Sequence, residues 1–232
     1  GQGFANGVGM AITERHLAAR YNRPGHHIIN HYTYVLVSDG DLMEGVAAEA
    51  ASLAGHLRLG KLICLYDDNH ITLSAGTNIT FTEDPAMRFA AYGWHTQTVE
   101  NGNDLAAVDR ALHAAQAERE RPSLILVCTH IGYGSPNKQD TFEGHGSPLG
   151  EEEVKLTKQA LGWPFGPPFY VPDQALVHFR LAIEQGKRAE AEWDVGFSEY
   201  SNAFPDLAKE FQQGMAGELP QGWDSDIPTF QA

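Results

Sequence analysis

Two groups of polar residues each follow an apolar run directly, and both groups contain residue types that can bind a cation. The run YVLV at 34–37 leads into SDGD, and KLICLY at 61–66 leads into DDNH. One carboxylate and one carboxamide, completed by carbonyl or water oxygens, suit Mg²⁺, which prefers about six oxygen ligands and commonly bridges to phosphates. Asp39 and Asn69 are therefore candidate ligands of a cation that holds a diphosphate.

The thirty residues from Asp39 to Asn69 are enough for one strand–helix–strand unit. Parallel strands end at a common edge of their sheet, and ligands of open α/β sheets bind beyond that edge. Gly40 would let a ligand approach the backbone, and the helix after it would direct its N-terminus at an anion. The residues alone leave a second interpretation open, in which Asp and Asn only cap the helices that follow.

Apolar runs that alternate with amphipathic segments predict an α/β fold, a parallel sheet with helices on both faces. The predicted strands are 33–38, 61–67, 94–100 and 123–129. The predicted helices are 1–20, 43–58, 84–92, 104–120, 151–161 and 173–213. In the second helix, Val46, Ala50, Leu53 and Leu57 stand at helical spacing. Glycines in the first helix, such as Gly7, indicate close packing of its backbone.

The pattern predicts two parts, an α/β domain over 1–163 and a C-terminal helical extension over 164–232. Residues 131–150 are rich in Gly and Pro and show no periodicity, and a loop of that length in a compact domain is usually functional or disordered. Residues 214–232 are irregular and acidic, and we expect a tail or the beginning of a linker there.

The composition restricts the class of partner. A net charge of −14 argues against nucleic acid or an anionic membrane as the main partner, so we expect neither. An anionic ligand would need a local cation, backbone N–H groups or histidines. No signal peptide or apolar run of membrane-spanning length is visible, and the two cysteines lie in apolar runs, as reduced buried thiols do. We therefore expect a cytoplasmic protein.

Other motifs fit less well. The G-x4-G-K pattern at 55–61 resembles a phosphate-binding loop, but residue 62 is Leu in place of Ser or Thr, and the segment connects a helix to a strand in the wrong order. The histidines at 26, 27 and 31 could bind a metal, although we favour a solvated connection there.

Longer segments of the sequence resemble the transketolase family. The stretch SDGDLMEGVAAEAASLAGHLRLGKLICLYDDNHITL is similar to the family's thiamine diphosphate motif, acid-Gly followed about thirty residues later by Asn. RFAAYGWHTQTVENGND, THIGYGSPNK and HGSPLG are similar to transketolase segments in the same order. The similarity covers nearly all of residues 1–163 and continues more loosely to the end. One local departure is Ser38, where the family usually has Gly.

The resemblance implies the thiamine-diphosphate-binding fold and a role for specific residues. Asp39, Asn69 and the backbone carbonyl of Ile71 would bind Mg²⁺ or Ca²⁺. Gly40 and Asn69 would contact the diphosphate of thiamine diphosphate, and Leu73 would pack beside the thiazolium ring. Residues 1–163 would be the diphosphate-binding domain, truncated at its N-terminus, and 164–232 would lead toward an absent pyrimidine-binding domain.

Three further residues acquire roles from the resemblance. His145, the histidine of the HG motif in the long loop, would lie near the diphosphate and the substrate and act in catalysis. Glu44 and, with less support, Glu49 would lie at a dimer interface and link the two cofactors of the dimer. From spacing alone, both glutamates are equally well explained as part of a solvated helix.

The implied reaction is reversible transfer of a two-carbon ketol unit from a ketose phosphate to an aldose phosphate. Because the cofactor of the family lies between two domains of different subunits, we expect this chain to need a homodimeric intact enzyme or a complementary pyrimidine-domain chain, and to be inactive alone. Two alternatives remain: another thiamine enzyme, such as 1-deoxyxylulose-5-phosphate synthase or a 2-oxo acid dehydrogenase, or a non-catalytic module that keeps the fold.

Overall fold

A sheet of four parallel strands forms the centre of the α/β part in the computed structural model, which describes residues 1–228. The strands are β1 (Thr33–Ser38), β2 (Leu62–Asp68), β3 (His95–Val99) and β4 (Ser123–Cys128), in the order β1-β2-β4-β3. Each lies within two residues of its predicted range. The predicted parallel sheet is confirmed.

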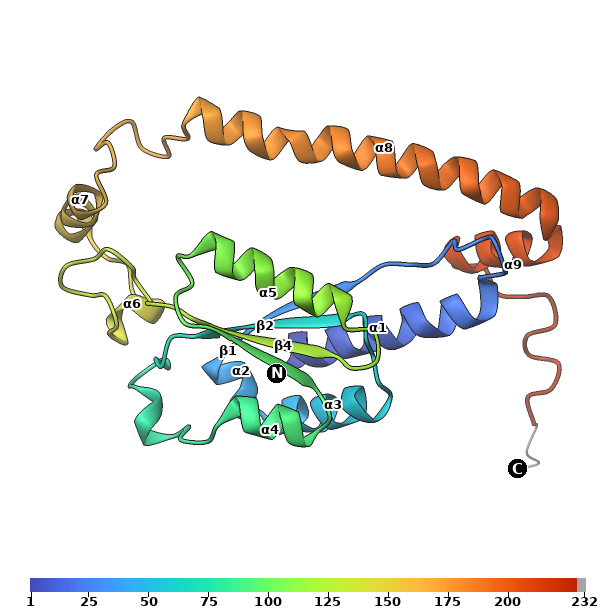
Figure 1. Ribbon diagram of the computed structural model, residues 1–232, viewed down its shortest axis with the longest axis horizontal. Helices are drawn as coiled ribbons and strands as arrows, with labels where there is room; N and C mark the ends of the chain where they lie inside the picture. Colours follow the sequence, from blue (N-terminus) through green and yellow to red (C-terminus); the bar gives the residue numbers. More distant parts are fainter. Residues whose placement is uncertain (229–232) are drawn as a thin grey trace. The chain divides into compact units, whose positions relative to one another are not determined.

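The direction of the connections explains which helices cover each face. Right-handed crossovers place their helices on one face while the chain moves one way across the sheet, and on the other face when it moves back. The steps from β1 to β2 and from β2 to β3 run in one direction, so α3 (Gly45–His56) and α4 (Pro85–Ala91) share a face. The step from β3 to β4 reverses, so α5 (Leu105–Ala117) covers the opposite face (Figure 1).

Both faces of the sheet bury an apolar core, as a parallel sheet requires. The core on the α3 side also receives α1 (Gln2–Tyr21) through Phe4 and Val8. Gly7 of this helix lies against β1, because a Cβ there would come within 2.3 Å of Val35 Cγ2. The expected close backbone packing is therefore confirmed at Gly7. The core on the α5 side consists of Ile63, Val99, Ala111, Ala115 and Ile125.

The helix predicted over 43–58 is confirmed over residues 45–56, but its beginning differs from the prediction. It is interrupted at Glu44, which is extended, so a short helix α2 (Asp39–Met43) precedes α3. The buried face of α3 is formed by Ala47, Ala51 and Ala54, while Val46 and Leu53 are exposed. Small side chains let this helix approach its neighbours, and a Cβ at position 55 would lie 1.9 Å from the carbonyl oxygen of residue 92.

The remaining helices are a 3₁₀ turn (Thr77–Ile79), α6 (Glu143–Gly146), α7 (Glu151–Ala160), α8 (Asp173–Ala203) and α9 (Pro205–Met215). The single helix predicted over 173–213 is thus interrupted. Pro205 is the first residue of α9, and the residue before a proline avoids the helical region, so the break falls at Phe204. Residues 216–228 form turns and irregular chain as predicted, and positions 229–232 of the expected tail lie outside the described residues.

The chain forms two compact units. The first contains residues 1–15 and 31–170, and the second contains 16–30 and the segment from 171 onward. The division therefore differs from the expected one after residue 163, because residues 164–170 belong with the sheet and residues 16–30 belong with the C-terminal helices. No helix within residues 1–228 is long and apolar enough to cross a membrane.

The second unit has its own aromatic core. Phe197, Tyr200 and Phe211 from α8 and α9 pack against Tyr21 and Ile28. Trp193 stacks on Phe197 with ring centroids 4.9 Å apart. Its indole N–H donates to the Ile28 carbonyl at 2.9 Å.

Candidate functional site

Three chain segments with polar residues leave the sheet at the same edge. The parallel register pairs Ser38 of β1 with Asp67 of β2, and Asp68 of β2 with Cys128 of β4. The residues that follow these strands therefore begin side by side. They are the turn into α2, the turn after Asp68 and the long loop 129–150 (Figure 1).

Asp39 is the most buried acidic residue at this edge, with 1% of its surface exposed. The hydroxyl of Tyr66, itself 2% exposed, donates to Asp39 Oδ1 at 2.6 Å. The other oxygen, Oδ2, is buried and has no hydrogen-bond partner among the described residues. Burial raises the pKa of the Asp39 carboxyl above its usual range, and the Tyr66 hydroxyl opposes this shift. An unpartnered buried carboxylate oxygen is unfavourable unless a cation binds it.

Asn69 closes the turn that follows β2. Its Oδ1 accepts from the Ile71 N–H at 3.0 Å, and its amide N–H donates to Asp67 Oδ2 at 3.1 Å. The β-bridge between Ile71 and Gly76 consists of two backbone hydrogen bonds, in which the N–H of residue 72 donates to the carbonyl of residue 75 and the N–H of residue 77 donates to the carbonyl of residue 70. The Ile71 carbonyl takes part in neither of them. Asn69 is buried, and its Oδ1 and the Ile71 carbonyl each keep capacity to bind a cation.

Gly40 lies in the first turn of α2 next to open space. A Cβ at this position would meet no atom within 4 Å, and the residue is exposed. The N–H groups of a first helical turn have no partner within the helix and can donate hydrogen bonds to an anion. Asp41, two residues after Asp39, instead accepts from the Ser38 N–H at 3.0 Å and so holds the start of the helix.

The long loop after β4 brings the HG motif close to Leu73. A Cβ at Gly146 would lie 3.6 Å from Leu73 Cδ1, so α6, which carries His145, lies beside that side chain. Leu73 is 69% exposed, and His145 is also exposed. An exposed leucine and a helix that carries an exposed histidine therefore lie close together, and they could offer one apolar and one polar contact to a ligand.

A buried glutamate that the sequence analysis missed fixes the same loop. Glu153 of α7 accepts from the Ser135 hydroxyl and from the Asn137 N–H at 2.9 Å, while Asn137 Nδ2 donates to its other oxygen at 2.8 Å. The hydrogen bonds from Asn137 and then Ser135 lower the pKa of Glu153. Lys138 Nζ donates at 3.2 Å to the carbonyl of Leu149. The SPNK segment (residues 135–138) thus fixes the long loop through its hydrogen bonds, so this motif has a structural role.

Glu44 and Glu49 are not part of the turn after β2 or of the long loop. Glu44 occupies the break between α2 and α3, with its side chain 56% exposed, and Glu49 is exposed on α3. A shallow open depression of about 610 Å³ borders Glu49, lined also by Ala48, Ser52, Leu53, His56 and Tyr92. Leu53 is 45% exposed there, so this side of α3 presents apolar surface between polar residues.

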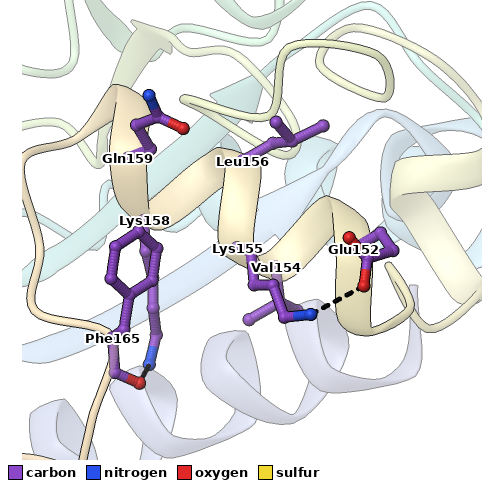
Figure 2. Close-up of a pocket in the computed structure, with 7 residues that line it drawn as sticks. All are labelled: Glu152, Val154, Lys155, Leu156, Lys158, Gln159 and Phe165. Atoms are coloured by element: carbon purple, nitrogen blue, oxygen red, sulfur yellow. Dashed lines mark hydrogen bonds and ion pairs between the residues drawn. The ribbon is translucent and has the colours of Figure 1, made fainter.

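A second depression, of about 470 Å³, lies on α7 and contains none of the predicted site residues (Figure 2). Its charged groups are already paired. Lys155 contacts Glu152 at 2.6 Å, and Lys158 Nζ donates to the Phe165 carbonyl at 3.1 Å. Among the described residues, each charged side chain that lines this depression therefore already has a partner, and none of the lining residues is buried.

The turn after β2 also brings two residues to Asp39 that the sequence analysis did not select. Donor atoms of Asp39, Asp68 and His70 all lie within 4.8 Å of one another. No other group of three His, Cys, Asp or Glu donors in residues 1–228 is this close, so the histidines at 26, 27 and 31 form no such cluster. The sequence signal for Asp68 and His70 was only their position beside Asn69.

The residues at the sheet edge fit a divalent cation and a diphosphate. The unpartnered Asp39 oxygen could supply charge, the oxygens of Asn69 and Ile71 could supply neutral donors, and the open space at Gly40 would admit an anion. Oxygen donors of this kind are those that Mg²⁺ and Ca²⁺ prefer.

Comparisons with known proteins identify a thiamine diphosphate-binding family. The family model described as "Transketolase, thiamine diphosphate binding domain" matches residues 1–220. The chain is 52% identical to a transketolase of Geobacillus stearothermophilus over 233 aligned positions, which cover all of this chain and 35% of that protein. It is 48% identical to the chloroplastic transketolase of Spinacia oleracea, covering 99% of this chain and 31% of the relative.

Solved structures show the same relationship. The transketolase from Leishmania mexicana matches with a TM-score of 0.95 and 43% identity, covering all of this chain and 35% of that one. The chain thus spans about a third of the length of the relatives that it matches. The match extends over both the sheet edge and the C-terminal helices, which confirms the expected thiamine-diphosphate-binding fold. The chain belongs to the transketolase family and corresponds to its thiamine diphosphate-binding domain.

Proposed function

We propose that this chain provides the diphosphate-binding half of a transketolase active site. The complete enzyme would transfer a two-carbon ketol unit between sugar phosphates. The observation that carries the proposal is the buried Asp39 carboxylate with one oxygen held by Tyr66 and the other without a partner. A cation that binds this oxygen would offset the cost of burying the charge.

In the proposed site, Asp39 and the oxygens of Asn69 and Ile71 hold Mg²⁺ or Ca²⁺. The cation and the open backbone at Gly40 then bind the diphosphate of thiamine diphosphate, which Asn69 also contacts. Leu73 would offer an apolar contact to the thiazolium ring. When bound, thiamine diphosphate supplies the electron sink that cleavage of a carbon–carbon bond in a ketose requires.

His145 is proposed to donate a hydrogen bond to the diphosphate or the substrate. Its loop emerges at the same edge of the sheet as Asp39, and its helix lies beside Leu73. The hydrogen bonds from the SPNK segment to Glu153 would keep this loop in one arrangement, so the imidazole would not have to be ordered when the substrate binds.

A partner is proposed to complete the site. The other domains of a homodimeric enzyme, or a complementary pyrimidine-domain chain, would supply the groups that activate the cofactor and grip the sugar phosphates. The proposed interface consists of Glu44 at the break before α3 and of the exposed side of α3 that carries Glu49 and the apolar Leu53. Surfaces that combine apolar side chains with a polar rim are typical of such contacts.

Thermal melting with Mg²⁺ and thiamine diphosphate tests the cofactor site. A ligand at about 100 times its Kd stabilises the folded chain by about 2.7 kcal/mol, which corresponds to a rise in Tm of about 5–10 °C for a chain of this size. Asp39→Asn keeps the volume of the side chain and its ability to accept from Tyr66 but removes the charge. We expect it to abolish the ligand-induced rise.

Two comparisons make the result specific. Asp109→Asn neutralises an exposed carboxylate on α5, 69% accessible, and should leave the rise in Tm unchanged. Asp39→Asn without ligand should melt no lower than the parent chain, because it removes a buried charge. A rise in Tm that persists in Asp39→Asn would refute the assignment. Ketol transfer from xylulose 5-phosphate should require addition of the complementary pyrimidine-domain chain.

A further inference from the structure

Asp67 links the ends of two neighbouring strands at the carboxyl edge of the sheet. Its Oδ2 accepts from the Asn69 amide N–H at 3.1 Å, and its Oδ1 accepts from the hydroxyl of Thr129, the first residue after β4. The Thr129 N–H donates to the Asp68 carbonyl at 3.1 Å and so extends the pairing of β2 with β4 by one residue. Both oxygens of the Asp67 carboxylate therefore have a partner, although the residue is exposed.

The two ends of the Asn69 carboxamide differ, and only the oxygen end can bind a cation. A carboxylate accepts hydrogen bonds and cannot donate them, so Asp67 can bond only to the amino end of Asn69. The oxygen end then accepts from the Ile71 N–H at 3.0 Å and keeps a second lone pair. A half-turn of the amide would set its oxygen against the carboxylate and its amino group against the Ile71 N–H, so both contacts would become repulsive.

We propose that Asp67, itself held by Thr129, is a positioning residue that keeps the carboxamide oxygen of Asn69 available to the cation. This inference rests on the proposed function, in which Asn69 is a ligand. Asn69 is only 9% exposed, so water cannot readily replace a lost partner of its amino group. Because Thr129 follows β4, the orientation of a ligand that follows β2 depends on the pairing of these two strands.

A simple attraction between the Asp67 charge and the cation makes a different prediction. Asp67→Asn removes the charge, yet its own amide oxygen can still accept from Asn69 while its amino group donates to the Thr129 hydroxyl. Asp67→Ala removes both the charge and the acceptor. Orientation therefore predicts that only Asp67→Ala weakens cation binding strongly, whereas attraction predicts similar losses in both variants.

Calorimetric titration of the full chain with Mg²⁺ in the presence of thiamine diphosphate compares these variants. Asp67→Ala should raise the Kd about 10–100-fold, as loss of a group that orients a metal ligand does. Asp67→Asn should raise it by no more than about fivefold, because an exposed charge contributes little. Thr129→Val leaves Asp67 in place but removes its support, so it should raise the Kd by a factor between these two.

Hydrogen exchange in the ligand-free chain gives a readout that does not depend on cofactor binding. The side-chain amide protons of Asn69 can be assigned by NMR from their absence in Asn69→Ser. They should exchange with water more slowly in the parent chain and in Asp67→Asn than in Asp67→Ala, because residue 67 accepts a hydrogen bond from this amide. Equal exchange in all three chains overturns the proposal.

Asp140→Asn is the matched control for charge. Asp140 lies in the long loop that leaves the same edge of the sheet, its side chain is 44% exposed, and it contacts His130. Asparagine tolerates the left-handed φ of 57° at this position. The Kd for Mg²⁺ should change by no more than about fivefold. A rise as large as that of Asp67→Ala would show that net charge at this edge sets the affinity, which overturns the positioning role.

The titrations also separate this proposal from the proposed function. Equally tight Mg²⁺ binding in the parent chain and in Asp67→Ala would overturn the positioning role and leave the proposed function intact. Equal losses in Asp67→Asn and Asp67→Ala would do the same, because the charge would then be sufficient to explain the effect. If the parent chain binds no thiamine diphosphate with Mg²⁺, the proposed function is refuted, and the positioning role with it.

Discussion

Tyr66→Phe is the most informative single change, because it removes one hydroxyl from beside the proposed cation ligand. The hydroxyl donates to Asp39 Oδ1 at 2.6 Å, and both side chains are almost fully buried. A hydrogen bond to a charged acceptor contributes about 1.5–3 kcal/mol. We therefore expect Tyr66→Phe to lower the free energy of unfolding of the metal-free chain at neutral pH by an amount in that range.

The same change should weaken cation binding. Burial already raises the pKa of Asp39, and the hydroxyl is the side-chain donor that opposes this shift. Without it, the protonated form is favoured further and the carboxylate is no longer fixed in orientation. Loss of a group that orients a metal ligand typically raises Kd about 10–100-fold, equivalent to about 1.4–2.7 kcal/mol. Calorimetric titration with Mg²⁺ in the presence of thiamine diphosphate measures this difference.

Tyr200→Phe is the matched control. Tyr200 is fully buried, and its hydroxyl has no hydrogen-bond partner among the described residues. Removal of that hydroxyl should not lower stability and should leave the Mg²⁺ affinity unchanged. If Tyr66→Phe binds Mg²⁺ as tightly as the parent chain does, Tyr66 does not orient a cation ligand and the argument from Asp39 fails.

The pH dependence of the cation effect follows from the direction of the Asp39 shift. A carboxyl group with a raised pKa in the folded state contributes stability below its unfolded value, near 3.8, and loses that contribution as the pH rises through the folded pKa. The rise in Tm with Mg²⁺ should therefore grow across this window. Tyr66→Phe should move the window to higher pH, which melting curves from about pH 4 to pH 8 would reveal.

Two further changes test the packing and the loop. Gly55→Ala should destabilise the chain by about 1–3 kcal/mol in chemical denaturation, because its Cβ would lie 1.9 Å from the Tyr92 carbonyl oxygen. Gly9→Ala in α1 is the control: a Cβ there meets nothing within 4 Å, so this change should stabilise the chain by about 0.5–1 kcal/mol. Equal effects of the two changes would contradict the packing at Gly55. Glu153→Gln should lower the Tm at neutral pH, because hydrogen bonds from Asn137 and its neighbours favour the charged form. Since the pKa of Glu153 is lowered, this contribution exists above about pH 4.5 and fades on acidification, so a Tm difference that does not shrink at lower pH would argue against a charged acceptor.

The sequence by itself determined the fold class and the family. Apolar runs that end in polar residues about thirty positions apart require neighbouring parallel strands, and the parallel sheet with helices on both faces is confirmed. The motif around Asp39 and Asn69, together with the longer segments such as GSPNK, identified the transketolase family, which the comparisons confirm. The break at Pro205 was also readable, since proline restricts the preceding residue, but the helical pattern on both sides concealed it.

Only the tertiary structure decided which groups reach one another. Helical spacing identified the helix α3 but not its buried face. The residues Ala47, Ala51 and Ala54 are buried because small side chains allow close approach to neighbouring backbone, whereas Val46 and Leu53 are exposed. The hydrogen bond from Tyr66 to Asp39 and the arrival of His70 beside it depend on strand register and on one left-handed turn. Periodicity describes the separation of residues along the sequence, whereas these contacts depend on the separation of their side chains in space. No pattern in the sequence could therefore have specified them.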